Sequence, residues 1–318
     1  MKTARLWAWL LGIAWICLAG CALAEGPEAP SVLPGSPCLT FADRALPFDE
    51  ADGCWYLPAA EDLAQVLCCD EALVQAVREI LPQDDLMRSE GFSLGEGKGR
   101  AVFTPLPVLA ITTGDGQEPG DEDSEGAMAL FDVDESGHLT VLETPLSVRV
   151  RGNTSRRFPK KSWRLELVDE WGEGFEHPLA GLRADDDWIL NPLYSDSSKL
   201  REALGYWLWE EMNSCGDFAA SSHLRFVEVL LNGRYYGLYA LQERVDKKQV
   251  RADENVDILY KISSNEQPTP QELRACTDWT RCKAFELEFA GARVQKPWEP
   301  AADLMELLSG GAPAGSVL

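Results

Sequence analysis

One short basic segment stands out in an otherwise acidic chain. The 318-residue sequence has a formal net charge of −23. Residues 148–167, VRVRGNTSRRFPKKSWRLEL, contain a single acidic residue, Glu166, against the cations Arg149, Arg151, Arg156, Arg157, Lys160, Lys161 and Arg164. Clustered Lys and Arg side chains bind phosphate groups through charge and hydrogen bonds. The acidity of the whole chain excludes nucleic acid and anionic membrane surfaces as partners. A small phosphate compound at one local site remains as the candidate ligand.

The alternation of residue types predicts a strand on each side of the loop in this segment. The first, residues 148–151, alternates valine with arginine. The second, residues 161–167, places Trp163 and two leucines on one face. Counting back in twos puts Lys161 on that inward face and Lys160 on the opposite one, if the strand begins that early. A buried lysine needs an anionic partner. The plain alternative is that the cations pair with acidic loops of the same chain.

Residues 132–143, DVDESGHLTVLE, also fit the pattern of a calcium-binding loop. The ligand positions are filled by Asp132, Asp134, Ser136 and Glu143. That loop requires a helix on each side, whereas Pro145 and a strand-like alternation follow it directly. A β-hairpin whose turn is DESG explains the same residues. We therefore expect the hairpin, with bound calcium as the alternative.

Helical spacing of apolar residues predicts three helices. Residues 70–81 match a short amphipathic helix, and residues 197–212 match a longer one that Ser195 or Asp196 can cap. Residues 301–308 indicate the start of another helix.

Three further segments read as strands. Residues 101–113 form one apolar run, which predicts a buried strand. Residues 224–245 contain two apolar runs that meet at Asn232-Gly233, the preferred two-residue turn of a β-hairpin. Residues 256–262, VDILYKI, indicate another strand.

The first residues predict export from the cytoplasm. Residues 1–24 have the layout of a secretory signal peptide, with Lys2 and Arg5 before an apolar run and small residues. LAGC, ending at Cys21, resembles a bacterial lipobox whose cysteine becomes lipidated, and the following ALA suits ordinary cleavage. We expect a cell-surface lipoprotein or a secreted protein, with membrane contact only through a lipid anchor. Residues 25–38 indicate a linker.

Export bears on the cysteines, because disulfides persist outside the cytoplasm. Cys276 and Cys282 are spaced to close a short loop, and free or buried thiols are the simpler alternative. The chain has three histidines and no C-x-x-C pair, so we expect no zinc site.

Four segments, in order, resemble the bacterial CotH family of spore-coat protein H-like atypical protein kinases. They are FTPLPVLAITT, RGNTSRRFPKKSWRLEL, LAGLRADDDWILNPLYSDSSKLREALGYWLWEEM and RFVEVLLNGRYYGLYALQERV. The resemblance covers roughly residues 101–300. It implies an α+β fold in which a kinase-like N-terminal lobe combines a mixed or antiparallel sheet with one packed helix. Residues 39–100 would form a small N-terminal module, and residues 101–318 a kinase domain that is incomplete at its C-terminus.

The resemblance also implies the ligand and its contacts. ATP with Mg²⁺ or Mn²⁺ would be the cofactor, and a protein Ser or Thr the substrate. Lys161 would hold the phosphates beneath the RGNTS loop, and the other candidate contacts are Arg151, Asn153, Ser155, Arg156 and Glu243. The roles of Arg156, Arg157 and Lys160 stay open.

A kinase lysine is usually held by a carboxylate on the packed helix. On residues 197–212, Glu202 falls opposite the apolar stripe and Glu211 faces inward. Glu243 is the other candidate partner for Lys161.

Catalytic residues cannot be assigned from the sequence. The family's catalytic and metal-binding aspartates lie in the C-terminal lobe, and nothing after Lys283 resembles that segment. Asp257 lies on a strand expected to belong to the N-terminal lobe, so it is no substitute. The alternatives to a kinase are an inactive surface scaffold and a calcium-organised surface protein.

Overall fold

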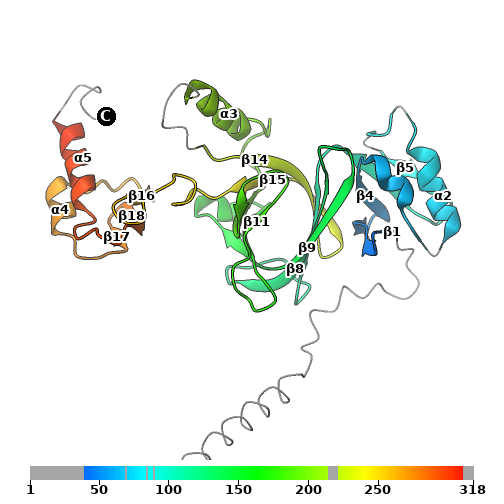
Figure 1. Cartoon of the computed structure of the whole chain (residues 1–318), viewed down its shortest axis with the longest axis horizontal. Helices are drawn as coiled ribbons and strands as arrows, with labels where there is room; N and C mark the ends of the chain where they lie inside the picture. Colours follow the sequence, from blue (N-terminus) through cyan, green and yellow to red (C-terminus); the bar gives the residue numbers. More distant parts are fainter. Residues whose placement is uncertain (1–38, 69, 84, 89, 214–220, 311–318) are drawn as a thin grey trace, which may run out of the picture.

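The computed structural model shows an α+β chain built from three units with three apolar clusters. The cluster of the N-terminal unit also contains residues of the barrel strands, such as Val108 and Phe131. The N-terminal unit and the C-terminal unit lie at opposite ends of a central β-barrel (Figure 1). The structure describes residues 39–68, 70–83, 85–88, 90–213 and 221–310. The predicted signal peptide and linker, with Cys21, fall outside these residues.

The N-terminal unit is a four-stranded sheet covered by a helix. The predicted helix is confirmed as α2 (Glu71–Ile80), whose first turn is capped by the Asp70 carboxylate. The sheet has the order β3-β4-β6-β5. The remaining bounds are β1 (Thr40–Phe41), β2 (Arg44–Ala45), β3 (Phe48–Asp49), β4 (Cys54–Pro58), η1 (Glu61–Gln65), β5 (Phe92–Ser93) and β6 (Arg100–Thr104).

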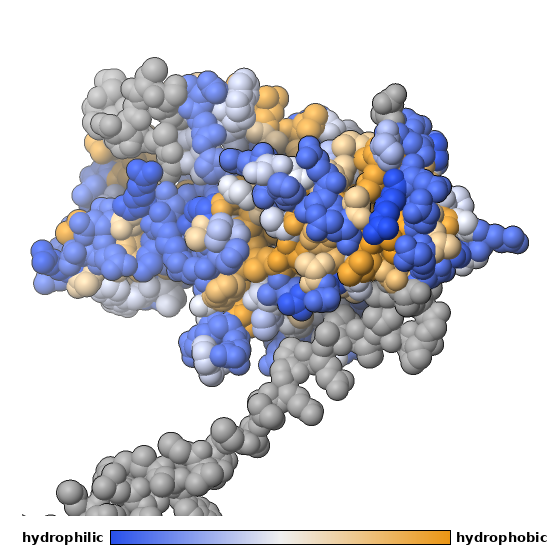
Figure 2. Space-filling model, turned by 45° about the vertical axis from the view of Figure 1, so that its right-hand side comes forward, coloured by the Kyte–Doolittle hydropathy of each residue, from blue (hydrophilic) through white to orange (hydrophobic). Residues whose placement is uncertain are grey.

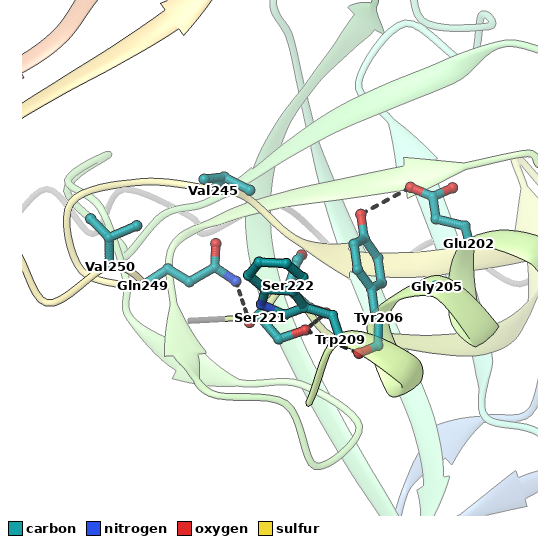
Figure 3. Close-up of a pocket in the computed structure, with 9 residues that line it drawn as sticks. All are labelled: Glu202, Gly205, Tyr206, Trp209, Ser221, Ser222, Val245, Gln249 and Val250. Atoms are coloured by element: carbon teal, nitrogen blue, oxygen red, sulfur yellow. Dashed lines mark hydrogen bonds between the residues drawn. The ribbon is translucent and has the colours of Figure 1, made fainter. Parts of the chain in front are cut away.

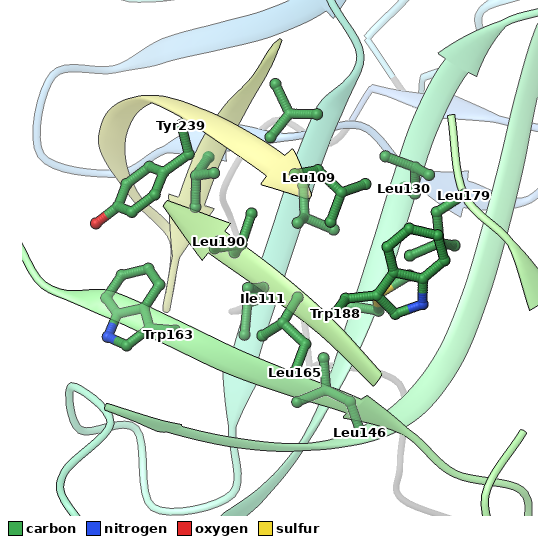
Figure 4. Close-up of a cluster of buried hydrophobic side chains, with 14 of the residues drawn as sticks. Leu109, Ile111, Leu130, Leu146, Trp163, Leu165, Leu179, Trp188, Leu190 and Tyr239 are labelled. Carbon is green, nitrogen blue, oxygen red and sulfur yellow. The ribbon is translucent and has the colours of Figure 1, made fainter. Parts of the chain in front are cut away.

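The central unit is a closed seven-stranded barrel in the order β10-β13-β15-β14-β7-β8-β9. Neighbouring strands are antiparallel except for the parallel pair β7 and β14. Figure 4 shows Trp163, Trp188 and Tyr239 pointing into the interior with a set of leucines. The strands are β7 (Val108–Thr113), β8 (Ser124–Val133), β9 (Leu139–Arg151), β10 (Ser162–Leu167), β13 (Asp187–Asn191), β14 (Leu224–Leu231) and β15 (Arg234–Glu243).

The barrel replaces the kinase-like sheet expected from the resemblance. The run at residues 101–113 is two strands rather than one, because it contains Pro105 and Pro107 and a proline cannot donate to a strand ladder. β6 therefore pairs with β4 in the N-terminal sheet, and β7 enters the barrel. Since β7 pairs with both β8 and β14, the strands close into a ring that leaves no free edge.

Two predicted hairpins are confirmed. β14 and β15 meet at Asn232 and Gly233, whose φ angles of 50° and 69° are those of the expected two-residue turn. β8 and β9 flank the turn at residues 134–138, so the segment that fits a calcium loop is a hairpin. The Asp134 carboxylate accepts the backbone N–H groups of Ser136 and His138 there, which is what a tight turn requires.

The predicted long helix forms as α3 (Arg201–Asn213), and Asp196 accepts the N–H of its first residue. The expectation that its apolar stripe packs inward is wrong. The exposed apolar side chains of α3 and its entry are Leu200, Leu204, Trp207, Leu208, Trp209 and Met212. Figure 2 shows hydrophobic side chains reaching the surface in the middle of that view, between hydrophilic regions.

The C-terminal unit contains the last two predicted elements. β16 (Ile258–Ile262) pairs with β18 in a separate three-stranded sheet, so its expected place in the N-terminal lobe sheet is wrong. The predicted final helix is α5 (Glu299–Ser309). The other elements are α4 (Pro270–Ala275), β17 (Arg281–Cys282) and β18 (Phe285–Ala290), and β11 (His177–Pro178) and β12 (Ala184–Asp185) form a ribbon beside the barrel.

No helix in the described part of the chain combines the length and the apolar character needed to cross a bilayer.

Candidate functional site

The loop between β9 and β10 is the basic segment singled out in the sequence. It turns at Gly152, whose φ of 97° suits glycine, and a Cβ there would lie 2.0 Å from Ser155 Oγ. A short 3₁₀ turn, η2 (Thr154–Arg157), follows. Asn153 precedes this turn and is exposed. The Arg156 guanidinium pairs with Asp121 at 2.9 Å, so this cation is partly neutralised by an acidic loop.

The two adjacent lysines differ from the expected arrangement. β10 begins only at Ser162, so the strand alternation that would turn Lys161 inward does not reach it. Lys161 donates to the Arg156 carbonyl at 2.7 Å and has no ion pair among the described residues. Lys160 is the more desolvated of the two. Its Nζ donates to the Leu238 carbonyl at 2.7 Å and lies 4.2 Å from the Tyr239 ring centroid.

A third lysine strengthens the positive charge at this end of the barrel. Burial, with repulsion from Lys199, lowers the pKa of Lys160 to about 8. Lys199 Nζ itself donates to the Leu193 carbonyl at 2.6 Å. Neither lysine has an ion-pair partner within the described ranges. Glu228 partly offsets these effects on Lys160, but two cations without an ion-paired carboxylate favour an anionic ligand.

Arg151, at the end of β9, is another cation without an ion pair among the described residues. It is half-buried and opposite Ser162 in the ladder, and it has no hydrogen-bond or ion-pair partner within the part of the chain that the structure describes. Burial and the nearby charge of Arg244 lower its pKa, while Asp187 and Glu202 oppose this from a longer range. A half-buried guanidinium without a contacting acceptor keeps its donors available for an anionic ligand.

Helix α3 contacts the outside of the barrel through polar groups. The Glu202 carboxylate accepts hydrogen bonds from Asn191 Nδ2 (2.8 Å), Tyr206 Oη (3.1 Å) and Gln242 Nε2 (3.0 Å). Glu202 therefore faces the barrel and Glu211 is exposed, the reverse of the expectation. The reason is the closed barrel: its interior is filled by its own strands, and its outer face offers Asn191 and Gln242 to a helix.

A pocket of about 510 Å³ lies between α3 and the chain that follows β15 (Figure 3). Pockets for small ligands typically measure about 300–1,000 Å³. Within it the Gln249 side chain donates to the Ser221 carbonyl at 2.7 Å, and burial raises the pKa of Tyr206 to about 12. The lining residues are Glu202, Gly205, Tyr206, Trp209, Ser221, Ser222, Val245, Gln249 and Val250.

Glu243 does not contact Lys161 in this structure. It is 3% exposed and accepts the backbone N–H groups of Arg183 (3.1 Å) and His223 (3.0 Å). The His223 ring lies between two carboxylates, with Nδ1 3.0 Å from Glu243 and Nε2 2.5 Å from Glu210. Glu243 thus joins β15 to the end of α3 through a histidine.

This histidine should make the attachment of α3 pH-dependent. Burial lowers the His223 pKa, but the hydrogen bonds to Glu210 and Glu243 outweigh it and raise the pKa above the ordinary value. Arg183, 4.0 Å from Glu243, is the nearby opposing cation. The stabilisation is complete below the unfolded pKa near 6.5 and is lost as pH rises through the folded pKa. Because His223 is half-exposed, we expect a change of under about 1 kcal/mol.

Hydrogen exchange of the α3 amides, corrected for intrinsic rates, measures this effect. Protection should fall a few-fold between about pH 6 and 8 in the wild type and stay constant in His223→Gln. His138→Gln, which alters an exposed histidine in the β8–β9 turn, is the control and should keep the wild-type profile. If protection in His223→Gln fell with pH as it does in the wild type, the assignment to His223 would be wrong.

The described residues contain no group of three or more His, Cys, Asp or Glu side chains placed to hold a metal ion. The three carboxylates among the candidate calcium ligands, Asp132, Asp134 and Glu143, have other partners. Asp132 accepts the N–H of Val133, and Glu143 pairs with Arg44 at 2.7 Å. We therefore assign no metal ligands for Mg²⁺, Mn²⁺ or calcium.

Sequence reasoning missed Asn191, Glu202, Gln242 and Lys199 as members of the site. Asn191 and Gln242 could have been found from the sequence, because each is a polar residue that follows apolar residues near the end of a strand, in WILN and YALQ.

Comparison with protein families matches residues 148–302 to the family described as CotH kinase protein. No curated protein matches the chain.

Proposed function

From the premise that residues 148–302 are a CotH-like segment, we propose that this chain binds ATP in the pocket between α3 and the end of β15. The observation that carries the proposal is Arg151, a half-buried cation with no contacting partner among the described residues. Glu202 and Tyr206, which line the pocket, act electrostatically on this arginine. An ATP phosphate is a suitable acceptor for the unused donors of a guanidinium.

The pocket chemistry suits a nucleotide. Tyr206 and Trp209 present aromatic surface, and Val245 and Val250 present aliphatic surface, for a flat base. Arg244, which repels Arg151, is itself paired with Asp187 and Glu288, so Arg151 is the cation that remains available for a phosphate. Phosphoryl transfer depends mainly on positioning and charge stabilisation, which such groups supply.

The finer parts of the proposal follow from the family. The activity implied by the family is ATP-dependent phosphorylation of Ser or Thr in a protein, with Mg²⁺ or Mn²⁺ bound to the nucleotide. Export, and lipidation of Cys21, are proposed from the first residues of the sequence. No residue of this chain is assigned as catalytic.

Calorimetric titration of the purified protein with Mg·ATP tests the proposal. We expect binding to the wild type and an affinity at least about tenfold weaker in Arg151→Met, since a charge-assisted hydrogen bond contributes about 1.5–3 kcal/mol. Arg149→Met is the matched control. This arginine lies two residues earlier on the same strand and pairs with Asp123 at 3.2 Å, so its affinity should stay within about twofold.

Two outcomes would contradict the proposal. An equal loss of ATP affinity in Arg151→Met and Arg149→Met would show that Arg151 contributes only general positive charge. Absence of binding to the wild type would favour a surface scaffold instead. Lys161→Met, measured in the same way, tests the phosphate lysine expected from the resemblance.

A further inference from the structure

The C-terminal unit has a small apolar core. The buried members are Leu273, Cys282, Ala284, Phe285, Trp298, Ala301 and Ala302. Units this small bury little apolar surface relative to the backbone they must order, and they commonly need an additional crosslink. Two of the residues that form or pack against this core are cysteines, Cys276 and Cys282.

The local fold brings these two thiols together. Cys276 ends α4, and Cys282 ends β17. The loop between them is folded back by Asp278, whose carboxylate accepts the Thr280 N–H at 2.8 Å. Trp298 Nε1 donates to the Asp278 carbonyl at 2.7 Å and ties the loop to the core. The Cys276 sulfur lies 3.6 Å from the carbonyl of Arg281, the residue before Cys282, and Cys276 packs against the core that contains Cys282.

The two thiols differ in accessibility, which sets the order of reaction. Cys282 is 7% exposed, and burial, with the neighbouring Cys276, raises its pKa to about 12. Cys276 is half-buried and therefore open to a reagent. Attack on an external disulfide depends on access and thiolate character, so Cys276 reacts first and Cys282 second.

We propose that Cys276 and Cys282 form an intramolecular disulfide that staples the C-terminal unit under oxidising conditions. The Cys276 thiolate attacks a disulfide oxidant, R–S–S–R, forming a mixed disulfide and releasing one R–SH. The Cys282 thiolate then attacks the Cys276 sulfur and releases the second R–SH. Each cysteine loses one proton, and the oxidant takes up two electrons and both protons.

Peptide mapping tests the bond directly. The protein is incubated with oxidised glutathione, blocked with iodoacetamide, denatured and digested with trypsin. Cleavage after Arg274, Arg281 and Lys283 leaves residues 275–281 and 282–283 as two peptides. We expect these peptides to be joined until dithiothreitol is added. Recovery of both as alkylated peptides, or of Cys276 as a stable glutathione adduct, would overturn the proposal.

Thermal melting tests the stapling. The oxidised protein should melt at least about 3 °C above the reduced protein, because a crosslink reduces the freedom of the unfolded chain. Cys276→Ser combined with Cys282→Ser should abolish this difference, whereas Cys68→Ser, in the N-terminal unit, should keep it. A linked peptide without any change in melting would refute the stapling.

Discussion

Replacing Trp188 with alanine is expected to lower the free energy of unfolding by about 4 kcal/mol, within the range known for buried tryptophan. Trp188 is fully buried in the barrel core, and its Nε1 donates to the Asp185 carbonyl at 3.0 Å. The closed ring of strands limits how far the surrounding side chains can collapse into the space left behind. Urea unfolding followed by near-ultraviolet circular dichroism measures the loss.

The chain offers a matched control for this substitution. Trp171 is 78% exposed, so Trp171→Ala should change the free energy of unfolding by no more than about 0.5 kcal/mol. The loss of free energy of unfolding in Trp188→Phe should lie between those of Trp188→Ala and Trp171→Ala. Phenylalanine keeps an aromatic ring in the core but leaves the Asp185 carbonyl without its donor. Equal effects of Trp188→Ala and Trp171→Ala would show that the barrel interior is not the main apolar core.

Replacing Asp187 with alanine should lower the free energy of unfolding by about 2 kcal/mol at neutral pH, because it removes the carboxylate that Arg164 and Arg244 share. Each arginine then keeps only its more exposed partner, Glu166 or Glu288. The two Asp187 oxygens accept Nε and Nη2 of Arg164 at 2.9 and 3.0 Å, and Arg244 Nη1 lies 2.5 Å away. Arg151, already unpaired, lies close enough to repel Arg244. The substitution would therefore concentrate three cations on one face of the barrel.

The effect of Asp187→Ala should depend on pH with a defined sign. Burial raises the Asp187 pKa, but the hydrogen bonds from Arg164 and Arg244 outweigh it, and the net pKa lies below the ordinary value. The carboxylate therefore stabilises the fold fully above the unfolded pKa near 3.9 and loses this effect as pH falls through the folded pKa. Urea unfolding at pH 7 and in steps below pH 4 should show the wild type and the variant converging.

Asp121→Ala provides the comparison for a surface pair. Asp121 also contacts an arginine, Arg156, at 2.9 Å, but its side chain is 71% exposed. Its removal should cost no more than about 1 kcal/mol. If the two aspartate variants were equally stable, burial would not be the source of the Asp187 contribution.

Local sequence patterns predicted individual helices and hairpins well, because capping, apolar spacing and turn geometry involve residues that are close in the sequence. The helix over residues 70–81 follows from its apolar spacing and the Asp70 cap, and the hairpin at Asn232-Gly233 follows from the φ angles that this pair adopts. The hairpin over residues 132–143 was preferred over a calcium loop for a similar reason, since Pro145 and alternating residues follow it. Each of these predictions is confirmed.

The predictions that failed were those about which face of a helix or strand packs against the rest of the protein. The apolar stripe of α3 was expected to pack inward, but the strands had already filled the barrel interior, so Glu202 and Tyr206 face the barrel instead. Lys161 was placed inward because the predicted strand began one residue before β10 does. Lys160 became the desolvated lysine because the loop carries it over Tyr239.

The sequence by itself determined most of the helices, strands and turns, and that the cations gather in one loop of an acidic chain. Spacing and turn chemistry act between near neighbours, so they can be read from the residues alone. Only the tertiary structure decided that the sheet closes, which depends on the pairing of β7 with β14 across more than a hundred residues. That closure placed α3 on the outside of the barrel and left Arg151 without a contacting partner among the described residues. The sequence could not show this, because neither burial nor the sign of neighbouring charges is a local property.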